Sequence, residues 1–335
     1  MKTLVTGGCG FIGSHFVKRL VARGESVVVL DKLTYSANRA NLTGIPFTLV
    51  EGDITDRFRV ALAAEGCDAI VNFAAESHVD RSILDAAEFI RTDVLGSQVL
   101  VEHAGKAGIR FVQVSTDEVY GDRSSATPAH EGDPLWPSSP YSASKAGGDL
   151  QVLAAVRTYG ADASITRGAN TYGPNQHPEK LIPLFVTNAL VGEPLPLYGD
   201  GRQIRDWIHV DDHCAAIDAV LQEGASGEIY NVGAGDEREN VEVTQRILEL
   251  TGASTGLIRH VADRAGHDRR YSLDTTKIRS LGWKPRRRFE DGLRETVDWY
   301  RENRDWWQPL KSGEYLAYYR KQYGARLSVD DSERS

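Results

Sequence analysis

Three glycines near the N-terminus, Gly7, Gly10 and Gly13, constrain the fold of this chain more than any other feature of its sequence. They follow an apolar strand pattern over residues 2–6 and open a helical pattern, and the next strand pattern ends at Asp31. Glycines at this spacing allow a tight turn, the close approach of a backbone to a pyrophosphate, and close packing of the helix. The sequence therefore predicts a dinucleotide site in which the helix N-terminus faces the phosphates.

Two acids beyond the glycine turn bear on which dinucleotide is bound. Asp31 is placed to accept hydrogen bonds from a ribose diol and would repel the 2′-phosphate of NADP, so we expect NAD. Lys32, which follows it, weakens this preference. Asp53 could accept a hydrogen bond from an adenine amino group or could simply cap its loop, and the sequence leaves both open.

Strand and helix patterns alternate through the first half of the chain. Strand patterns cover residues 47–51, 69–73, 111–114 and 163–167, and helical patterns cover 85–105 and 141–159. This rhythm predicts the α/β class, with a Rossmann-type, doubly wound parallel sheet covered on both faces. Ligands of such sheets bind beyond the carboxyl ends of the strands.

After Arg167 the sequence becomes rich in turn-forming residues, which indicates a second, smaller lobe. We expect residues 1–167 to form the NAD-binding domain, with a strand, helix and strand over 206–232 returning to its sheet. The C-terminal α/β substrate-binding lobe would then comprise 168–205 and 233–327, with an aromatic segment at 306–323 packed on the body and a polar tail at 328–335.

Two short stretches carry side chains suited to catalysis. Thr116, Asp117 and Glu118 come where an apolar strand ends, and adjacent carboxyl groups in a dry site tend to have separated pKa values, one serving as acid and one as base. Tyr141 and Lys145 lie four residues apart on one helical face. An ammonium beside a phenol lowers the pKa of the phenol, so we expect Tyr141 to accept a proton. The alternatives are a solvated loop pair and a helix-start aromatic with a surface lysine.

Composition excludes several other functions. The net charge of −8 argues against nucleic acid or an anionic membrane as the main partner. No apolar run approaches the ~20 residues that a bilayer requires, and no signal peptide is visible. The three cysteines lack metal-ligand spacing, so we expect no metal site and free thiols in a reducing cytoplasm.

Taken together, the motifs resemble a known family. The glycine turn with Tyr141-x-x-x-Lys145 resembles the extended short-chain dehydrogenase/reductase superfamily. Within it, residues 74–82 (AAESHVDRS), the Thr116-Asp117-Glu118 triplet, 178–183 (PEKLIP) and 266–271 (GHDRRY) are similar to the dTDP-glucose 4,6-dehydratases. The similarity runs from residue 1 to about 324.

This resemblance implies a reaction and a role for each catalytic residue. dTDP-glucose would become dTDP-4-keto-6-deoxyglucose by oxidation at C4, elimination of water across C5–C6 and return of the hydride to C6, with tightly bound NAD. Tyr141, helped by Lys145 and Thr116, would take the O4 proton. Glu118 would remove H5, and Asp117 would protonate the departing O6 hydroxyl.

The resemblance also implies the binding residues. Those for the cofactor are Gly7, Gly10, Phe11, Ile12, Gly13, Asp31, Lys32, Leu33, Thr34, Asp53, Ile54, Phe73, Ala74, Ala75, Ser77, Thr92, Tyr141 and Lys145. Those for the nucleotide sugar are Ser77, Thr116, Asn170, Lys180, Leu181, Pro196, Leu197, Tyr198, Arg205, Asn240, Arg264 and His267. The helices over 85–105 and 141–159 would pair into a four-helix homodimer interface as in the family, although periodicity does not distinguish this from burial within one chain.

Related functions remain alternatives. A nucleotide-sugar 4-epimerase needs the same Tyr, Lys and NAD but no acid pair. A decarboxylase needs a basic partner for a substrate carboxylate, and residues 115–121 contain no Arg. A UDP-sugar dehydratase also remains open, because the thymine methyl that distinguishes dTDP from UDP needs only a small apolar niche. A non-catalytic NAD-sensing scaffold would have little use for Tyr141, Lys145 and both acids. The chain departs from the family at Cys9, where Ala is more usual, and in the short polar loop 122–133.

Overall fold

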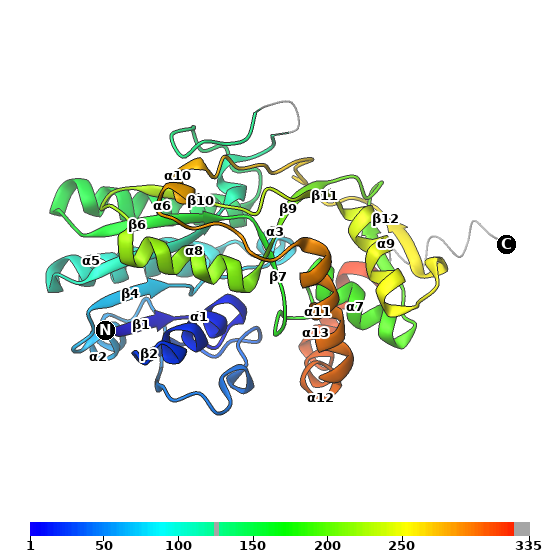
Figure 1. Ribbon diagram of the computed structural model, residues 1–335, viewed down its shortest axis with the longest axis horizontal. Helices are drawn as coiled ribbons and strands as arrows, with labels where there is room; N and C mark the ends of the chain where they lie inside the picture. Colours follow the sequence, from blue (N-terminus) through cyan, green and yellow to red (C-terminus); the bar gives the residue numbers. More distant parts are fainter. Residues whose placement is uncertain (124–126, 325–335) are drawn as a thin grey trace.

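The computed structural model describes residues 1–123 and 127–324. In this part of the chain, seven parallel strands form one large sheet in the order β10-β6-β5-β4-β1-β2-β3 (Figure 1). The strand order reverses between β1 and β4, where ligands of such sheets bind. The doubly wound α/β fold is thereby confirmed. The strands are β1 (Lys2–Thr6), β2 (Ser26–Asp31), β3 (Thr48–Glu51), β4 (Ala69–Asn72), β5 (Arg110–Thr116), β6 (Ala163–Gly168) and β10 (Ile229–Val232).

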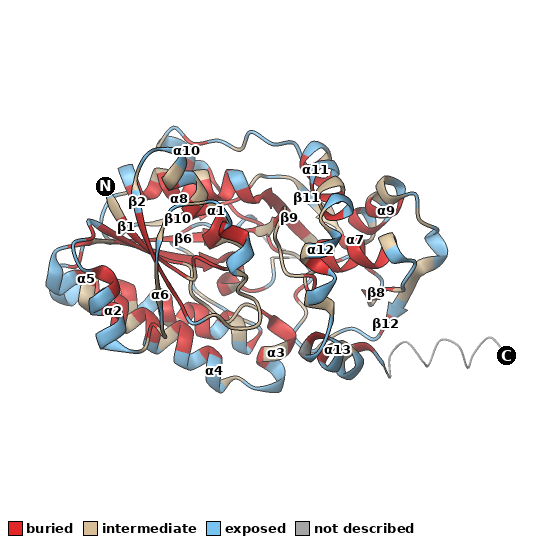
Figure 2. Cartoon of the chain, turned by 90° about the horizontal axis from the view of Figure 1, so that it is seen from below, coloured by how far each residue is buried: buried red, intermediate tan, exposed pale blue. Residues whose placement is uncertain are grey.

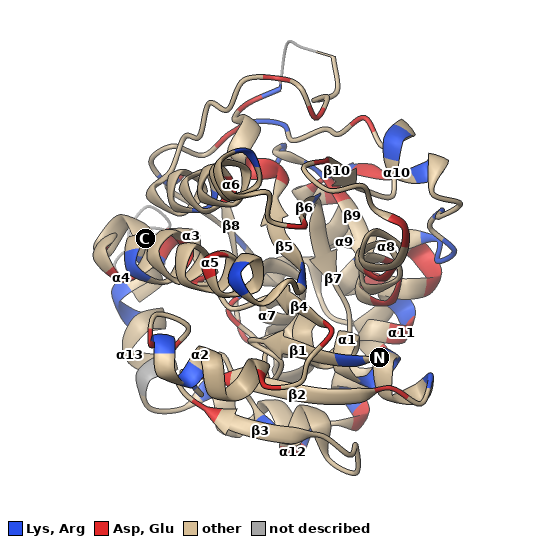
Figure 3. Cartoon of the chain, turned by 90° about the vertical axis from the view of Figure 1, so that its left-hand side faces the viewer, with Lys and Arg blue, Asp and Glu red and all other residues tan. Residues whose placement is uncertain are grey.

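Helices cover both faces of this sheet because its central strands are buried along their whole length, as parallel strands require. One face packs against α1 (Phe11–Ala22), α8 (Val210–Glu223) and α10 (Thr276–Ser280), and the other against α2 (Arg57–Ala64), α5 (Ser97–Ala107) and α6 (Pro140–Tyr159). In Figure 2 the strands are buried, whereas the helices are buried on the side facing them and exposed on the other. In Figure 3 charged residues lie mostly on the surrounding helices and loops.

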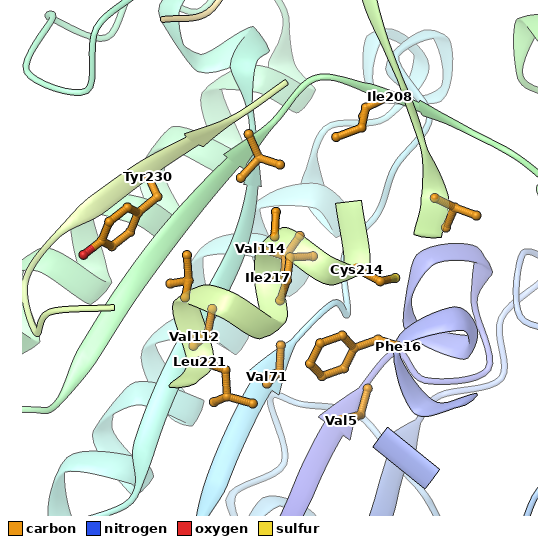
Figure 4. Close-up of a cluster of buried hydrophobic side chains, with 14 of the residues drawn as sticks. Val5, Phe16, Val71, Val112, Val114, Ile208, Cys214, Ile217, Leu221 and Tyr230 are labelled. Carbon is orange, nitrogen blue, oxygen red and sulfur yellow. The ribbon is translucent and has the colours of Figure 1, made fainter. Parts of the chain in front are cut away.

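The apolar core on the α1 and α8 face holds these layers together (Figure 4). Burying each large aliphatic or aromatic side chain there contributes about 1.5–3 kcal/mol. The side chains that meet in it include Val5 and Val71 from the strands, Phe16 from α1, and Cys214 and Ile217 from α8. All of them are fully or almost fully buried.

Local sequence signals define both ends of helix α6, which carries Tyr141 and Lys145. Ser139 and Ser142 form a capping box at its start, and Pro140 occupies the first helical position. Gly160, in the left-handed conformation with φ of 67°, ends it. The helix predicted over 141–159 is therefore confirmed.

The helix predicted over residues 85–105 is confirmed in its main part, since residues 87–107 are helical without interruption, but its middle is π-helical. The structure has α4 (Ala87–Phe89), the π-helical segment η2 (Ile90–Gly96) and α5, preceded by α3 (Val79–Leu84). Helix α6 approaches closely at this point, since a Cβ on Gly148 would lie 2.5 Å from the carbonyl oxygen of Asp93. Thr92, in this π-helical segment, lines the cavity at the carboxyl ends of the large-sheet strands.

The smaller lobe, at the right of Figure 1, contains two further sheets. Strands β11 (Glu237–Glu239), β9 (Ile204–His209) and β7 (Asn170–Tyr172) form one, and β12 (Ile258–Val261) pairs with β8 (Leu195–Tyr198). The strand expected at 206–210 therefore does not join the large sheet, because β9 pairs with β7 and β11 instead. Helix α8 and strand β10 do return to it.

Helices of the smaller lobe enclose a separate apolar cluster. They are α7 (Leu181–Val191), α9 (Asn240–Thr251), α11 (Phe289–Glu302), α12 (Arg304–Trp307) and α13 (Glu314–Tyr319), together with the short segments η4 (Thr255–Leu257), η5 (Pro309–Lys311) and η6 (Arg320–Gly324). Two further short turns, η1 (Arg39–Leu42) and η3 (Asp117–Tyr120), belong to the larger domain. Trp307, Tyr315 and Tyr323 are buried, so the aromatic C-terminal segment packs on the body as predicted. The polar tail 328–335 lies outside the described residues, as does part of the 122–133 loop. None of the described helices is long and apolar enough to cross a membrane.

Candidate active site

A cavity of about 300 Å³ lies at the carboxyl ends of the large-sheet strands. It brings together residues from the glycine turn, the ends of β2, β4, β5 and β6, the start of α6 and the smaller lobe. The predicted site residues that line it are Gly7, Gly10, Phe11, Ile12, Gly13, Asp31, Lys32, Thr34, Asp53, Ile54, Phe73, Ala74, Ala75, Ser77, Thr92, Thr116, Asp117, Glu118, Tyr141, Lys145, Asn170 and Lys180.

The glycine turn fits a dinucleotide phosphate group. Gly7 has φ of +64°, and a Cβ there would lie 2.7 Å from the backbone nitrogen of Ala74. A Cβ on Gly13 would lie 2.3 Å from the carbonyl oxygen of Gly7, so only glycines allow the backbone to fold this tightly. Gly10 precedes the first residue of α1, whose free backbone N–H groups therefore border the cavity. The neighbouring Cys9 is fully buried, and burial raises the pKa of its thiol to about 12.

Asp31 and Asp53 both have structural partners as well as cavity-lining positions. The Oδ2 atom of Asp31 accepts a hydrogen bond from the Cys9 amide at 2.9 Å, and Oδ1 accepts one from the Leu33 amide at 2.8 Å. Burial raises the pKa of Asp31, and these two hydrogen bonds oppose the shift. Asp53 pairs with Lys32 at 3.0 Å and caps its own loop through Thr55. Lys32 is thus drawn toward Asp53.

The two acids lie in one short turn, η3, at the end of β5. The Thr116 hydroxyl accepts a hydrogen bond from the Glu118 amide at 3.3 Å and donates one to Oδ1 of Asp117 at 3.2 Å. Asp117 is only 3% exposed. Burial and the neighbouring Glu118 carboxylate raise the pKa of Asp117 to about 8. Asp117 is therefore protonated near neutral pH while half-buried Glu118 lies beside it, which is the division into acid and base that adjacent carboxyl groups allow.

Tyr141 and Lys145 both line the cavity, but the expected pKa shift of Tyr141 is wrong for the protein alone. Burial and the negative charges of Glu118 and Asp93 raise the pKa of Tyr141 well above its ordinary value. Lys145 is buried, and its ammonium donates a hydrogen bond to the carbonyl oxygen of Val114 at 2.8 Å. The shared helical face brings the two side chains to the cavity, yet burial first, and then acids from other elements, raise the pKa of the phenol.

Asn170 and Lys180 line this cavity, but most of the other candidates for nucleotide-sugar binding in the smaller lobe do not. Arg205 is buried, donates hydrogen bonds to the carbonyl oxygens of Ile204 and Asp268, and stacks 4.1 Å from the centre of the Tyr271 ring. The described residues that line the cavity include none of Leu33, Leu181, Pro196, Leu197, Tyr198, Arg205, Asn240, Arg264 and His267.

A second group of these candidates lies around Asp80 and Asp263. Arg264 lies 3.5 Å from Oδ1 of Asp80, and the Tyr198 hydroxyl donates to Oδ2 at 2.9 Å. His267 contacts Asp263 at 2.5 Å, and burial lowers the pKa of His267 to about 4. The structure therefore ties two of these candidates to one buried carboxylate and a third to a neighbouring acid.

Sequence reasoning missed two functional neighbours of these residues. Tyr271 follows the predicted His267 by four positions, and its hydroxyl lies 3.4 Å from Oε2 of Glu118. Asp93, at the π-helical segment, accepts a hydrogen bond from the Ser144 hydroxyl at 2.6 Å and helps to raise the pKa of Tyr141. Burial raises the pKa of Asp93 itself to about 6, against the opposing charge of Lys145. Tyr271 lies inside a motif that the resemblance quoted, whereas no local signal marked Asp93.

Comparison with known proteins agrees with this site. Residues 4–296 match the family model described as GDP-mannose 4,6 dehydratase. A dTDP-glucose 4,6-dehydratase of Streptomyces niveus is 53% identical over 324 residues, which cover 93% of this chain and 96% of that protein. The crystal structure of DesIV, a dTDP-glucose 4,6-dehydratase from Streptomyces venezuelae with NAD and TYD bound, is 55% identical with a TM-score of 0.91, over 93% of this chain and 100% of that one.

A UDP-glucose 4-epimerase from Thermus thermophilus, in complex with NAD, has the same fold at lower identity. It is 33% identical with a TM-score of 0.85, over 90% of this chain and 100% of that one. The higher identity to the dehydratases agrees with the acid pair in the cavity. The chain therefore belongs to the dTDP-glucose 4,6-dehydratase family.

Proposed function

We propose that this protein converts dTDP-glucose to dTDP-4-keto-6-deoxyglucose with tightly bound NAD. One observation carries the proposal: the carboxyl groups of Asp117 and Glu118 lie side by side in the cavity that also contains Tyr141 and Lys145. An enzyme that only moves hydride needs the phenol and the ammonium. The pair of carboxyl groups indicates that water is also eliminated.

The order of the chemistry follows from the acidity of the substrate. H5 of a hexose is not acidic, whereas a hydrogen next to a ketone is, so C4 has to be oxidised before water can leave across C5–C6. Bound NAD would supply this oxidation by accepting hydride from C4 and would return the hydride to C6, so that the reaction needs no external reductant. Residues of the glycine turn together with Asp31 would hold this cofactor.

Each catalytic side chain then has one proton to move. Tyr141 would take the proton of the C4 hydroxyl, which requires that ligand binding lower the pKa that burial raises in the protein alone. Lys145 and Thr116 would assist from the same cavity. Glu118 would remove H5 as general base, and Asp117, which already holds a proton, would donate it to the departing O6 hydroxyl.

The substrate diphosphate would bind in the smaller lobe. This protein is acidic overall, so a diphosphate needs a local concentration of donors. Arg205, Arg264, Asn240 and His267 supply them, and Arg264 would exchange part of its contact with Asp80 for the ligand. The resemblance favours dTDP over UDP, and parallel turnover of dTDP-glucose and UDP-glucose under the same conditions measures this preference.

The exposed side of the α5 and α6 layer supports a homodimer. Ile90, Leu95 and Leu150 expose about half of their surface along η2 and α6, and all three are apolar. A second copy of the chain would cover this face with the same elements and form a four-helix interface. We place the dimer in the cytoplasm, where the buried thiols Cys9, Cys67 and Cys214 would remain reduced.

The proposed reaction is tested by its product. Purified protein given dTDP-glucose and no reductant should form a 4-keto-6-deoxy sugar nucleotide, identified by NMR and mass spectrometry. Formation of dTDP-galactose alone would identify a 4-epimerase and contradict the proposal.

A further inference from the structure

A buried ion pair links the strand beside the acid pair to the helix that carries Tyr141 and Lys145. Arg167 is at the end of β6, opposite Ser115 in the sheet register. Its Nε atom donates to Oδ2 of Asp149 at 2.9 Å, and the two side chains are 2% and 0% exposed. Asp149 lies one helical turn beyond Lys145 on α6, so the pair acts on the face of the helix that borders the cavity.

The same arginine also holds the turn that carries the acids. Its Nη1 atom donates to the Tyr120 hydroxyl at 2.9 Å, and its guanidinium carbon lies 4.8 Å from the centre of the Tyr120 ring. The Tyr120 hydroxyl in turn donates to Oδ1 of Asn231 at 2.8 Å. Tyr120 is the last residue of η3, and Asp117 and Glu118 are its first two. Arg167 therefore hydrogen-bonds directly to both elements, α6 and η3, that carry the catalytic side chains.

Stability alone is a poor explanation for this arrangement. Removing two charges from water costs several kcal/mol per ion, and buried pairs often do no better than apolar residues of the same size. Burial raises the pKa of Asp149, and Arg167 opposes that shift, so the ionised state of the acid depends on the partner. A charged group in this place instead fixes the relative position of the elements that it connects.

We propose that Asp149, Arg167 and Tyr120 form a brace that positions the acid turn η3 against the Tyr141 and Lys145 face of α6. This inference rests on the proposed function and adds positioning residues to it. The turn has only four residues; the Thr116 hydroxyl caps its start, and the Tyr120 hydroxyl is the polar anchor of its last side chain. The brace acts through Glu118 and Asp117 and does not itself touch substrate.

Loss of the brace should affect two steps of the reaction to different extents. Oxidation at C4 uses groups on α6, whereas elimination uses groups on η3, and a shift of about 1 Å between them can slow a step by about a hundredfold. Loss of the brace should therefore slow elimination more than oxidation. A merely structural role would lower the stability and leave the balance between the two steps unchanged.

Tyr120→Phe tests the brace with a minimal change, and Tyr230→Phe is its matched control. Both phenols are buried and hydrogen-bonded, but Tyr230 accepts its bond from the Ala225 amide, away from the cavity. We expect Tyr120→Phe to lower kcat on the order of tenfold with little change in KM. Enzyme-bound NADH, followed at 340 nm during turnover, should accumulate in this variant and not in Tyr230→Phe.

Arg167→Lys is the second variant, since lysine keeps the charge beside Asp149 but lacks the second arm toward Tyr120. It should also accumulate NADH. The double variant, Tyr120→Phe with Arg167→Lys, should be less impaired than the product of the two single effects, because both substitutions remove the same contact between Arg167 and Tyr120. Parental kcat and NADH level in both single variants would overturn the brace and leave the proposed function intact. Equal slowing of oxidation and elimination would overturn it too. Failure of the parent protein to dehydrate dTDP-glucose would instead overturn the proposed function, and the role of the brace with it.

Discussion

The hydroxyl of Tyr271 lies 2.8 Å from Oδ2 of Asp268 and 3.4 Å from Oε2 of Glu118, so one buried phenol connects two carboxylates. Burial and the Glu118 charge raise the pKa of Tyr271 well above its ordinary value, which keeps the phenol protonated as a hydrogen-bond donor. The shorter contact is to Asp268. The single phenol proton therefore goes to Asp268, and Glu118 stays available to take a proton from the substrate.

Replacing the general base Glu118 should stop the elimination of water but not the oxidation at C4. Glu118→Gln keeps the size of the side chain but cannot accept H5, so elimination should fall by at least about a hundredfold. Oxidation at C4 should continue, and bound NADH should rise at 340 nm without formation of the 4-keto-6-deoxy product. Adding Gln176→Glu to Glu118→Gln returns a negative charge to the cavity without returning a base to the turn, so this double variant controls for charge. Dehydration by Glu118→Gln at the parental rate would refute this role.

Asp117 should make the protein less stable as the pH rises. Its pKa moves from the ordinary 3.8 to about 8 in the folded protein. Between these values the folded protein holds a proton that the unfolded chain has lost, so the free energy of unfolding falls as the pH increases through this window. Asp117→Asn should remove that slope and be more stable than the parent at pH 8, on the order of 2–5 kcal/mol, while losing elimination.

Thermal unfolding between pH 5 and about 9 measures this slope. The matched control is Asp305→Asn, at an exposed acid of the smaller lobe, which should leave the parental pH dependence unchanged. An Asp117→Asn protein that destabilises with pH as steeply as the parent would mean that Asp117 is ionised throughout, and it could not then be the general acid.

Much of the large sheet could be predicted because its strands are continuous apolar runs bounded by turn residues. The sheet membership of residues 204–209 could not, because the choice of pairing partner depends on β7 and β11 rather than on the strand itself. The π-helical stretch at residues 90–96 could not be predicted either, and it lies where Gly148 of a later helix approaches the backbone of Asp93. Local periodicity carries no information about such contacts.

The site divides in the same way. The residues of the glycine turn are close together in sequence, and so are the two acids, so the chemistry of each motif could be predicted. The structure brings the two motifs to one cavity. The electrostatic surroundings of Tyr141 could not be predicted, since Asp93 reaches it from a segment with no motif. Lys145 was expected to act on the phenol, but its ammonium also has a backbone acceptor at Val114.

Gly7→Ala should release the cofactor. The new Cβ would combine a φ of +64° with a contact of 2.7 Å to the Ala74 backbone, which no side-chain movement can relieve. Gly24→Ala is the matched control, because Gly24 has φ of +81° and nothing within 4 Å of its Cβ position. Backbone strain of about 1–3 kcal/mol is common to both. Only Gly7→Ala should lose most of its bound NAD after gel filtration, and equal NAD content in both variants would contradict the fit of the turn to phosphate.

The proposed dimer should dissociate when its apolar face is charged. Leu150→Glu places a carboxylate where 55% of a leucine is exposed on α6, and it should convert the dimer to monomer in sedimentation analysis. Phe58→Glu is the control, because Phe58 is 88% exposed on α2, outside this face. A dimer that persists in Leu150→Glu but not in Phe58→Glu would place the interface on α2 instead.

The central claim is that hydride leaves C4 and returns to C6 within one enzyme molecule while Glu118 removes H5. Incubating the protein, without reductant, with a mixture of unlabelled dTDP-glucose and dTDP-glucose that carries both deuterium at C4 and carbon-13 in its sugar tests it most directly. We predict that the deuterium appears at C6 of the same molecules, and that in D₂O the C5 position takes up solvent deuterium. Product with deuterium retained at C4, or with none at C6, would contradict the account.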